Sequence, residues 1–194
     1  MKLSALLVAA SLSLAVNFWA LQPLASLPEA WIKAGPGVNA YELGVDHLEQ
    51  RSGRGSKTIR SLNGVIEQDF ATVMQNLRAD QYRGSQVRFS AEIKSSELVG
   101  WGGLWMQVEA SGGKILALDN MQARPIKQDS EWQRHEVILN IAPEATLIRF
   151  GLHMTGVGQI WMDNLVFEKV LNQSSTNTGV SPDDFVSERT EPVL

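Results

Sequence analysis

Aromatic and long polar side chains alternate with apolar residues along two segments of the chain. Trp105 and Gln107 stand between apolar residues in one segment, and Arg149 and His153 do so in the other. Because successive side chains of a β-strand point to opposite faces, these four residues should share a surface while the apolar residues form a core. An indole can stack on a pyranose ring, and guanidinium, amide and imidazole groups can hydrogen-bond hydroxyl groups. The pattern therefore predicts a surface that binds a sugar or a small polar molecule, unless a loop covers Trp105.

Four further residues are candidates for the same surface. Trp101 lies between two glycines and is expected on a mobile loop, where it either caps a ligand or plugs an edge of the fold. Asp119, Asn120 and Arg124 fall in one strand-to-loop segment. They either supply polar contacts at the rim of the site, or they satisfy turn amides while Arg124 pairs with Asp119. Both alternatives are open at this point.

The sequence contains no recognisable catalytic motif. It has neither a Gly-x-Ser-x-Gly elbow nor a His-Glu-x-x-His motif, and its three histidines are scattered. Residues 53–58 resemble a phosphate loop, but no lysine directly follows a glycine there. Glu92 and Glu109 would form a glycosidase pair if neighbouring strands brought them face to face. We therefore predict a protein that binds its ligand without transforming it, with a hydrolase as the alternative.

Composition limits the class of protein further. The 194 residues include 44% hydrophobic side chains, which suffices for the core of one domain. The net charge of -4 is spread without a block of Lys or Arg, so nucleic acid is not the expected partner. The absence of cysteine excludes a disulfide framework, thiol catalysis and a cysteine-ligated zinc site.

Residues 1–25 have the pattern of a secretory signal or of a membrane anchor. Lys2 precedes a short apolar run that reaches Leu14, and small residues follow at the positions that a signal peptidase recognises. The apolar character continues beyond Ala15 to Leu21, so an uncleaved anchor is the alternative. We expect a periplasmic or secreted protein, or one that contacts the membrane through this segment alone.

The rest of the chain shows the period-two pattern of an all-β domain over residues 26–170. Alternation predicts strands at 87–94, 104–109, 114–119, 136–141, 147–154 and 159–167. One short helix is expected at 69–77. Strands at this spacing, separated by Gly, Pro and Asn turns, indicate an antiparallel β-sandwich or jelly roll. Residues 171–194 are polar and are expected to form a disordered tail.

Several motifs resemble those of galactose-binding-like jelly rolls, the fold of many carbohydrate-binding modules. They include the run Gly-Trp-Gly-Gly-Leu-Trp-Met at 100–106, Phe150-Gly151, and the closing Trp-Met-Asp-Asn at 161–164. The resemblance covers residues 31–170 and is strongest to a poorly characterised bacterial branch, found on transcriptional regulators and secreted peptidases. No helix-turn-helix or peptidase motif is found in this sequence, so neither activity is implied.

The resemblance also implies two structural roles near the last strand. Trp161 is expected in the core. Asp163 is expected either to bond loop backbone or to join Glu42 or Asp46 around a structural calcium ion, which needs six to eight oxygen ligands. No cofactor is required. The predicted function is thus an envelope or secreted module that binds a glycan or small polar molecule, and the alternative is an accessory domain that binds a partner protein.

Overall fold

The computed structural model of the chain describes residues 22–65 and 69–170. The signal or anchor pattern of residues 1–21 and the polar tail of residues 171–194 lie outside this part. Within the described residues, no helix is long and apolar enough to cross a membrane. The first described residues already pack on the domain, because Ala25 forms a β-bridge with Val45.

The described chain is almost entirely β-structure, as predicted. The strands are β1 (Ile32–Ala34), β2 (Tyr41–Asp46), β3 (Ser56–Ser61), β4 (Phe70–Arg78), β5 (Gln86–Ala110), β6 (Ile115–Asp119), β7 (Ser130–Asn140) and β8 (Ala145–Val170). Two short 3-10 turns, Val38–Ala40 and Ser111–Gly113, join neighbouring strands. All strand pairs are antiparallel.

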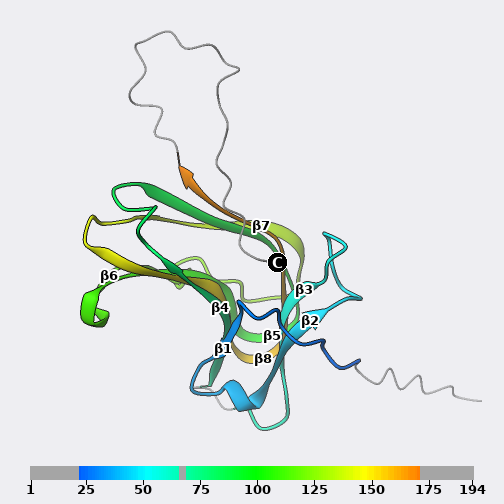
Figure 1. The fold of residues 1–194 in the computed structure, drawn as a ribbon. Coiled ribbons are helices and arrows are strands. Elements are labelled where there is room, and N and C mark those ends of the chain that lie inside the picture. Colours follow the sequence, from blue (N-terminus) through cyan, green and yellow to red (C-terminus); the bar gives the residue numbers. More distant parts are fainter. Residues whose placement is uncertain (1–21, 66–68, 171–194) are drawn as a thin grey trace, which may run out of the picture.

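The strands form two layers because β5 and β8 bend and contribute to both (Figure 1). The first sheet contains β1, β4, residues 145–157 of β8, residues 99–110 of β5, and β6, in this order. The second sheet contains β2, β3, the last part of β8, the first part of β5, and β7. The pairing of β5 with β8 shifts register between Ser96 and Val99, where both strands pass from one sheet to the other.

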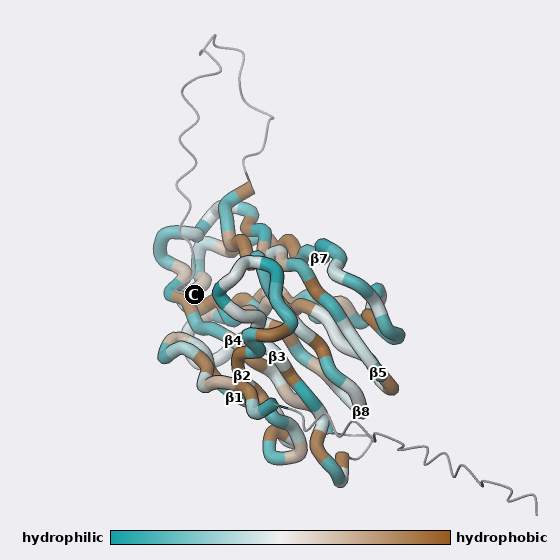
Figure 2. The backbone as a smooth tube through the Cα atoms, turned by 90° about the vertical axis from the view of Figure 1, so that its right-hand side faces the viewer, coloured by the Kyte–Doolittle hydropathy of each residue, from teal (hydrophilic) through white to brown (hydrophobic). Residues whose placement is uncertain are grey.

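The core lies between the two sheets. Phe150 of the first sheet meets Phe89 and Phe167 of the second, with ring centroids 4.8 and 4.5 Å apart. Figure 2 shows hydrophobic and hydrophilic residues alternating along β5 and β8, as strands with one buried face require. Among the apolar residues of the predicted strands, Phe89, Met106, Phe150 and Leu152 are fully buried, whereas Leu139 is partly buried at the edge of the core.

The predicted helix at 69–77 is wrong, because this segment is strand β4. Ala71 and Val73 face the core, and Thr72 is buried on the other face of the sheet. The β-branched side chains of Thr72 and Val73 favour an extended backbone. The glycines at 156 and 158 separate the strands predicted at 147–154 and 159–167, but they lie at a bend within the single strand β8.

Trp161 is buried, as predicted, but it does not point between the sheets. Its neighbours Ile160 and Met162 face the core, so alternation places Trp161 on the outer face of the second sheet. There its indole Nε1 donates a hydrogen bond of 2.9 Å to Asp46 Oδ2.

Candidate functional site

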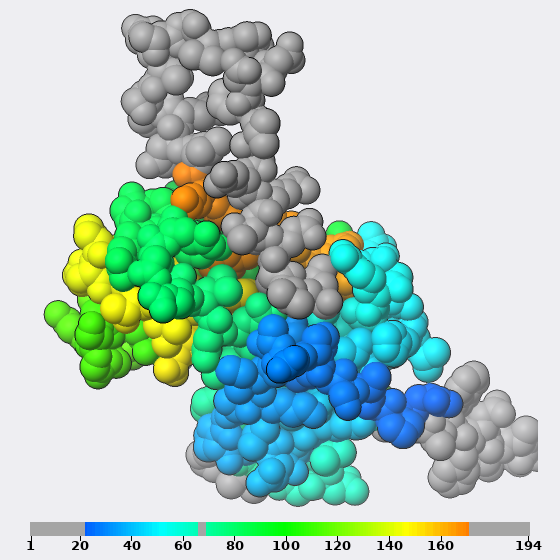
Figure 3. All heavy atoms as spheres, viewed as in Figure 1, coloured from blue at the N-terminus to red at the C-terminus, as the bar shows by residue number. Residues whose placement is uncertain are grey.

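A groove runs along the outer face of the first sheet. Its volume is about 400 Å³, and its lining comes from β1, β4, β5, β8 and the loop after β6. Figure 3 shows the surface hollowed between the blue N-terminal part and the green and yellow parts of the chain. The lining residues are Ala34, Gly35, Phe70, Thr72, Met74, Trp101, Trp105, Gln107, Asn120, Arg149, His153 and Thr155.

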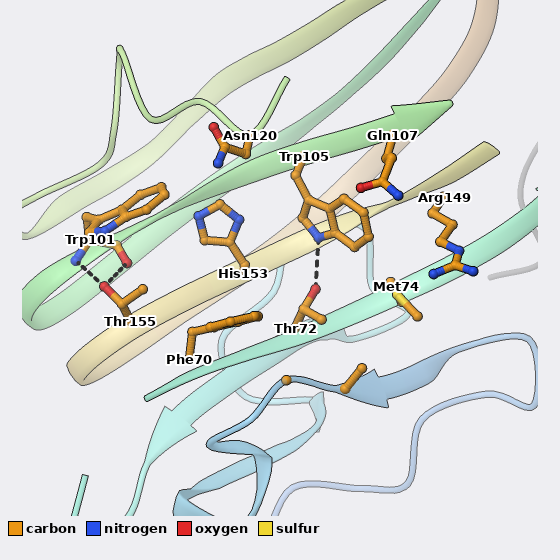
Figure 4. A pocket seen from close by; sticks show the side chains of 12 residues that line it. Phe70, Thr72, Met74, Trp101, Trp105, Gln107, Asn120, Arg149, His153 and Thr155 are labelled. Carbon is orange, nitrogen blue, oxygen red and sulfur yellow. Dashed lines mark hydrogen bonds between the residues drawn. The ribbon is translucent and has the colours of Figure 1, made fainter. Parts of the chain in front are cut away.

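Strand register arranges these side chains in rows across the sheet. His153 on β8 lies beside Thr72 on β4 and Gly103 on β5. Trp105 and Gln107 follow along β5, and Gln107 pairs with Arg149. Residues 101, 105, 107, 149 and 153 therefore share one face, because they are separated by even steps along their strands. The close-up in Figure 4 shows all five on the groove side of the sheet.

Thr72 fixes the plane of the Trp105 indole. Trp105 Nε1 donates to Thr72 Oγ1 over 2.8 Å, and this hydroxyl group donates in turn to the carbonyl oxygen of Leu152 over 2.7 Å. Trp105 is partly exposed and lines the groove, so no loop seals it. An indole with a fixed orientation and one open face can act as a stacking platform for a sugar ring.

Glu109 orients the two long polar side chains at one end of the groove. Its side chain is 7% exposed, and Oε1 accepts a hydrogen bond of 2.5 Å from Gln107 Nε2. Arg149 Nε lies 3.2 Å from the same oxygen, which is an ion-pair distance without the alignment of a hydrogen bond. The guanidinium and carboxylate charges offset each other, and the side chain of Arg149 stays 39% exposed.

The loop after β6 carries Asn120 to the rim of the groove. Asp119 accepts hydrogen bonds of 3.1 and 2.8 Å from Arg124. Its Oδ1 also accepts a hydrogen bond from the backbone amide of Met121. These bonds shape the turn, so Asp119 and Arg124 satisfy each other beside the groove and do not line it. Met121 then covers Gly103, where an added Cβ would lie 3.0 Å from the Met121 side chain.

His153 is the most buried titratable side chain that lines the groove, with 7% exposure. Burial lowers its pKa from 6.5 to about 4, so the imidazole is uncharged at neutral pH. The Trp101 indole meets it edge-on, with ring centroids 4.5 Å apart and an interplanar angle of 84°. Trp101 is not on a loop as predicted, because it lies within β5 and pairs with Thr155.

Of the eight candidate residues, the structure brings together Trp101, Trp105, Gln107, Asn120, Arg149 and His153. Thr72 was not predicted to line the groove, because its segment was assigned to a helix. The orienting role of Glu109 was not predicted either, although the spacing 105, 107, 109 places this residue on the same strand face.

The carboxylates proposed for a hydrolase or a calcium site are engaged elsewhere. Glu92 lies in the second sheet and bonds Arg51, so it does not face Glu109. Asp163 accepts the backbone amides of Arg51 and Ser52 over 2.6 and 2.9 Å, as the loop-bonding alternative predicted. Within residues 22–65 and 69–170, no group of three acidic or histidine side chains is placed to hold a metal ion. The structural calcium ion stays a prediction.

The two-sheet architecture with a groove on one outer face defines a jelly roll of the kind found in carbohydrate-binding modules. The CBM22-1 xylan-binding domain from Paenibacillus barcinonensis Xyn10C superposes with a TM-score of 0.52 at 14% identity, over 76% of this chain and 90% of that domain. The C-terminal family 22 carbohydrate-binding module of Clostridium thermocellum Xyn10B gives a TM-score of 0.51 at 15% identity, over 74% and 89% of the two chains. These likenesses confirm the predicted fold.

The same fold occurs in larger proteins of other kinds. The enzymatically active domain of tailspike protein 4 from bacteriophage CBA120 gives a TM-score of 0.55 at 10% identity, over 73% of this chain and 20% of that one. In sequence, the chain is 33% identical over 142 residues to YbfP of Bacillus subtilis strain 168, an uncharacterized transcriptional regulator of the helix-turn-helix type. The match covers 73% of this chain and 48% of that relative, so the chain spans about half of it. No family model matches the chain.

Proposed function

We propose that this protein is a non-catalytic binding module that holds a glycan in the groove of the first sheet. The observation that carries the proposal is the Trp105 indole, which is fixed by Thr72 and open to the groove. Stacking on this plate removes the apolar C–H face of a sugar ring from water. The folds of the xylan-binding module and the family 22 module support the same conclusion.

The polar groups around the platform match the chemistry of hydroxyl groups. Arg149 and Asn120 contribute N–H donors, and Gln107 keeps its carbonyl oxygen as an acceptor while its amide nitrogen bonds Glu109. A hydroxyl group both donates and accepts, so a glycan can satisfy all of these groups. Since Glu109 offsets the charge of Arg149, the groove favours a neutral glycan.

A glycan-array screen of the purified chain tests this function. We expect the wild-type protein to bind a defined set of glycans and Trp105→Ala to lose that signal with its fold intact. Trp132→Ala is the matched control, because Trp132 lies in the second sheet and bonds Glu49. An array without signal, or equal signals for wild type and Trp105→Ala, would contradict the proposal and favour the accessory domain that binds a partner protein.

A further inference from the structure

A nitrogen atom on the floor of the groove has no hydrogen-bond partner. His153 Nε2 is buried, and no group of the described residues bonds it. Buried polar atoms without partners are unfavourable and rare in native proteins. Such an atom inside a cavity therefore points to a partner that binds there.

The neighbours of His153 cannot supply this hydrogen bond. The Thr72 hydroxyl group donates its one proton in a hydrogen bond to the Leu152 carbonyl oxygen. It accepts a hydrogen bond from the indole N–H of Trp105. Gly103, on the other side, has no side chain, and Met121 covers it. Asn120 turns its amide nitrogen toward the imidazole in Figure 4, but the two do not form a hydrogen bond.

The chemical state of the ring indicates what kind of partner is missing. Because burial lowers the pKa of His153 to about 4, the ring is neutral at pH 7. A neutral imidazole has one N–H donor and one nitrogen with a free lone pair. A hydroxyl group of a sugar is a donor that can reach such a lone pair.

Trp101 is the aromatic neighbour of His153 in the groove. Its indole stands against the imidazole and also lines a second hollow, which includes Val65, Val99 and Val157. The backbone of Trp101 is held in the sheet, since its N–H and carbonyl oxygen both contact Thr155 Oγ1 at 3.3 Å. The Trp101 backbone is thereby fixed, and its indole lies between the groove and the second hollow.

We propose that Nε2 is the unprotonated nitrogen of the His153 ring and that it determines which hydroxyl group the groove accepts, because it takes a hydrogen bond from a ligand hydroxyl group. This assignment rests on the proposed function and adds a specific acceptor to it. In the free protein Nε2 is then a buried acceptor without a partner, and a bound ligand supplies the missing donor. Trp105 supplies the stacking platform, and His153 supplies the selection among ring hydroxyl groups.

Binding and stability measured together test the role of His153. The variant is His153→Phe, the matched control is His135→Phe on β7, and the probe is xylohexaose or the strongest glycan on the array. We expect His153→Phe to bind the probe at least tenfold more weakly, with an equal or higher Tm. The phenylalanine keeps an aromatic ring at this position and removes the buried nitrogen that has no partner. His135→Phe should bind as wild type does. Equal binding by wild type and His153→Phe overturns the assignment and leaves the proposed function standing, whereas no wild-type binding on the whole array overturns both.

Nitrogen NMR of histidine-labelled protein gives a second measurement that does not depend on the variant folding. His153→Gln identifies the His153 signals among the three histidines. We expect Nε2 to show the signal of an unprotonated nitrogen in the free protein, and the signal to move toward the hydrogen-bonded range when the probe is added. An Nε2 that carries the proton in the free protein, or a signal that the bound probe does not move, would contradict the proposal.

Discussion

Each polar side chain of the groove is held by a partner behind it. Thr72 fixes the plane of Trp105, and the buried carboxylate of Glu109 positions Gln107 and Arg149. Such pre-positioning lowers the entropy lost on binding, because the side chains are already ordered. His153 is the exception, since its Nε2 is buried but has no hydrogen-bond partner among the described residues.

The burial of His153 makes stability depend on pH. The unfolded imidazole titrates near 6.5 and the folded one near 4, so between these values the unfolded chain binds a proton that the folded chain does not. Stability is therefore complete above pH 6.5 and falls as the pH drops toward 4. We expect a loss of about 2 kcal/mol in the free energy of unfolding between pH 7 and pH 5 from this group.

Urea unfolding of wild type and His153→Phe at both pH values measures this contribution. The variant removes the titrating group and should lose correspondingly less stability on acidification. The comparison isolates His153 from His47 and His135, which both proteins contain. Equal losses in the two proteins would show that His153 titrates normally, and the argument for a buried neutral ring would fail.

Residue spacing predicted much of the groove, and local pairing explains the rest. Trp105, Gln107, Arg149 and His153 were recognised because alternation alone assigns a strand residue to a face. For Asp119 and Arg124, the sequence allowed a binding role and a structural role in which the two residues pair. The structure shows them paired with each other. Sequence could not decide this, because the turn that joins them holds Met121 at a positive φ of 59°, which its residue type does not indicate.

At the scale of the element, the bends of β5 and β8 decide the architecture. Each strand was predicted as two separate strands, with Gly100 and Gly156 in the segments between them. In the structure these glycines have positive φ angles of 129° and 75°, and each strand continues into the other sheet. Glycine marks a change of direction, but the sequence does not say whether the chain reverses or bends.

The loop between β2 and β3 is held by Asp163, which gives a prediction for this element. Burial raises the pKa of Asp163, but the amides of Arg51 and Ser52 offset this, and the pKa lies below its usual range. Asp163→Ala leaves these amides without their acceptor. We expect a loss of about 2 kcal/mol in stability and faster hydrogen exchange at residues 51 and 52.

Hydrogen exchange measured residue by residue distinguishes a local effect from a global one. In the groove strands β4 and β8, protection from hydrogen exchange should fall only by the amount that the loss of global stability accounts for. Unchanged exchange at Arg51 and Ser52 in Asp163→Ala would show that other contacts hold the loop.

At the scale of the whole molecule, the sequence predicts export. Lys2 and the apolar run that follows motivate this expectation, which lies outside the described residues. We propose a periplasmic or secreted location and expect mass spectrometry of protein from the native host to find a chain that starts after Ala15 or a nearby small residue. An intact Met1 in the membrane fraction would identify an anchor, and an intact Met1 on a soluble cytoplasmic protein would contradict export.

Five of the six tryptophans lie in the described residues and provide reporters spread over this part of the molecule. Trp101 and Trp105 line the groove, Trp31 lies in the core, and Trp132 and Trp161 belong to the second sheet. A ligand in the groove should therefore affect the indole N–H groups of the first pair and leave the other three unchanged.

The most direct test of glycan binding in the groove is a titration followed by the indole N–H signals in the NMR spectrum. The probe is the strongest glycan from the array, and Trp→Phe variants assign each signal. The account predicts that the Trp101 and Trp105 signals shift in a saturable manner, while those of Trp31, Trp132 and Trp161 stay in place. Shifts at Trp132 or Trp161 with an unmoved Trp105 signal would place binding on the second sheet and contradict the account.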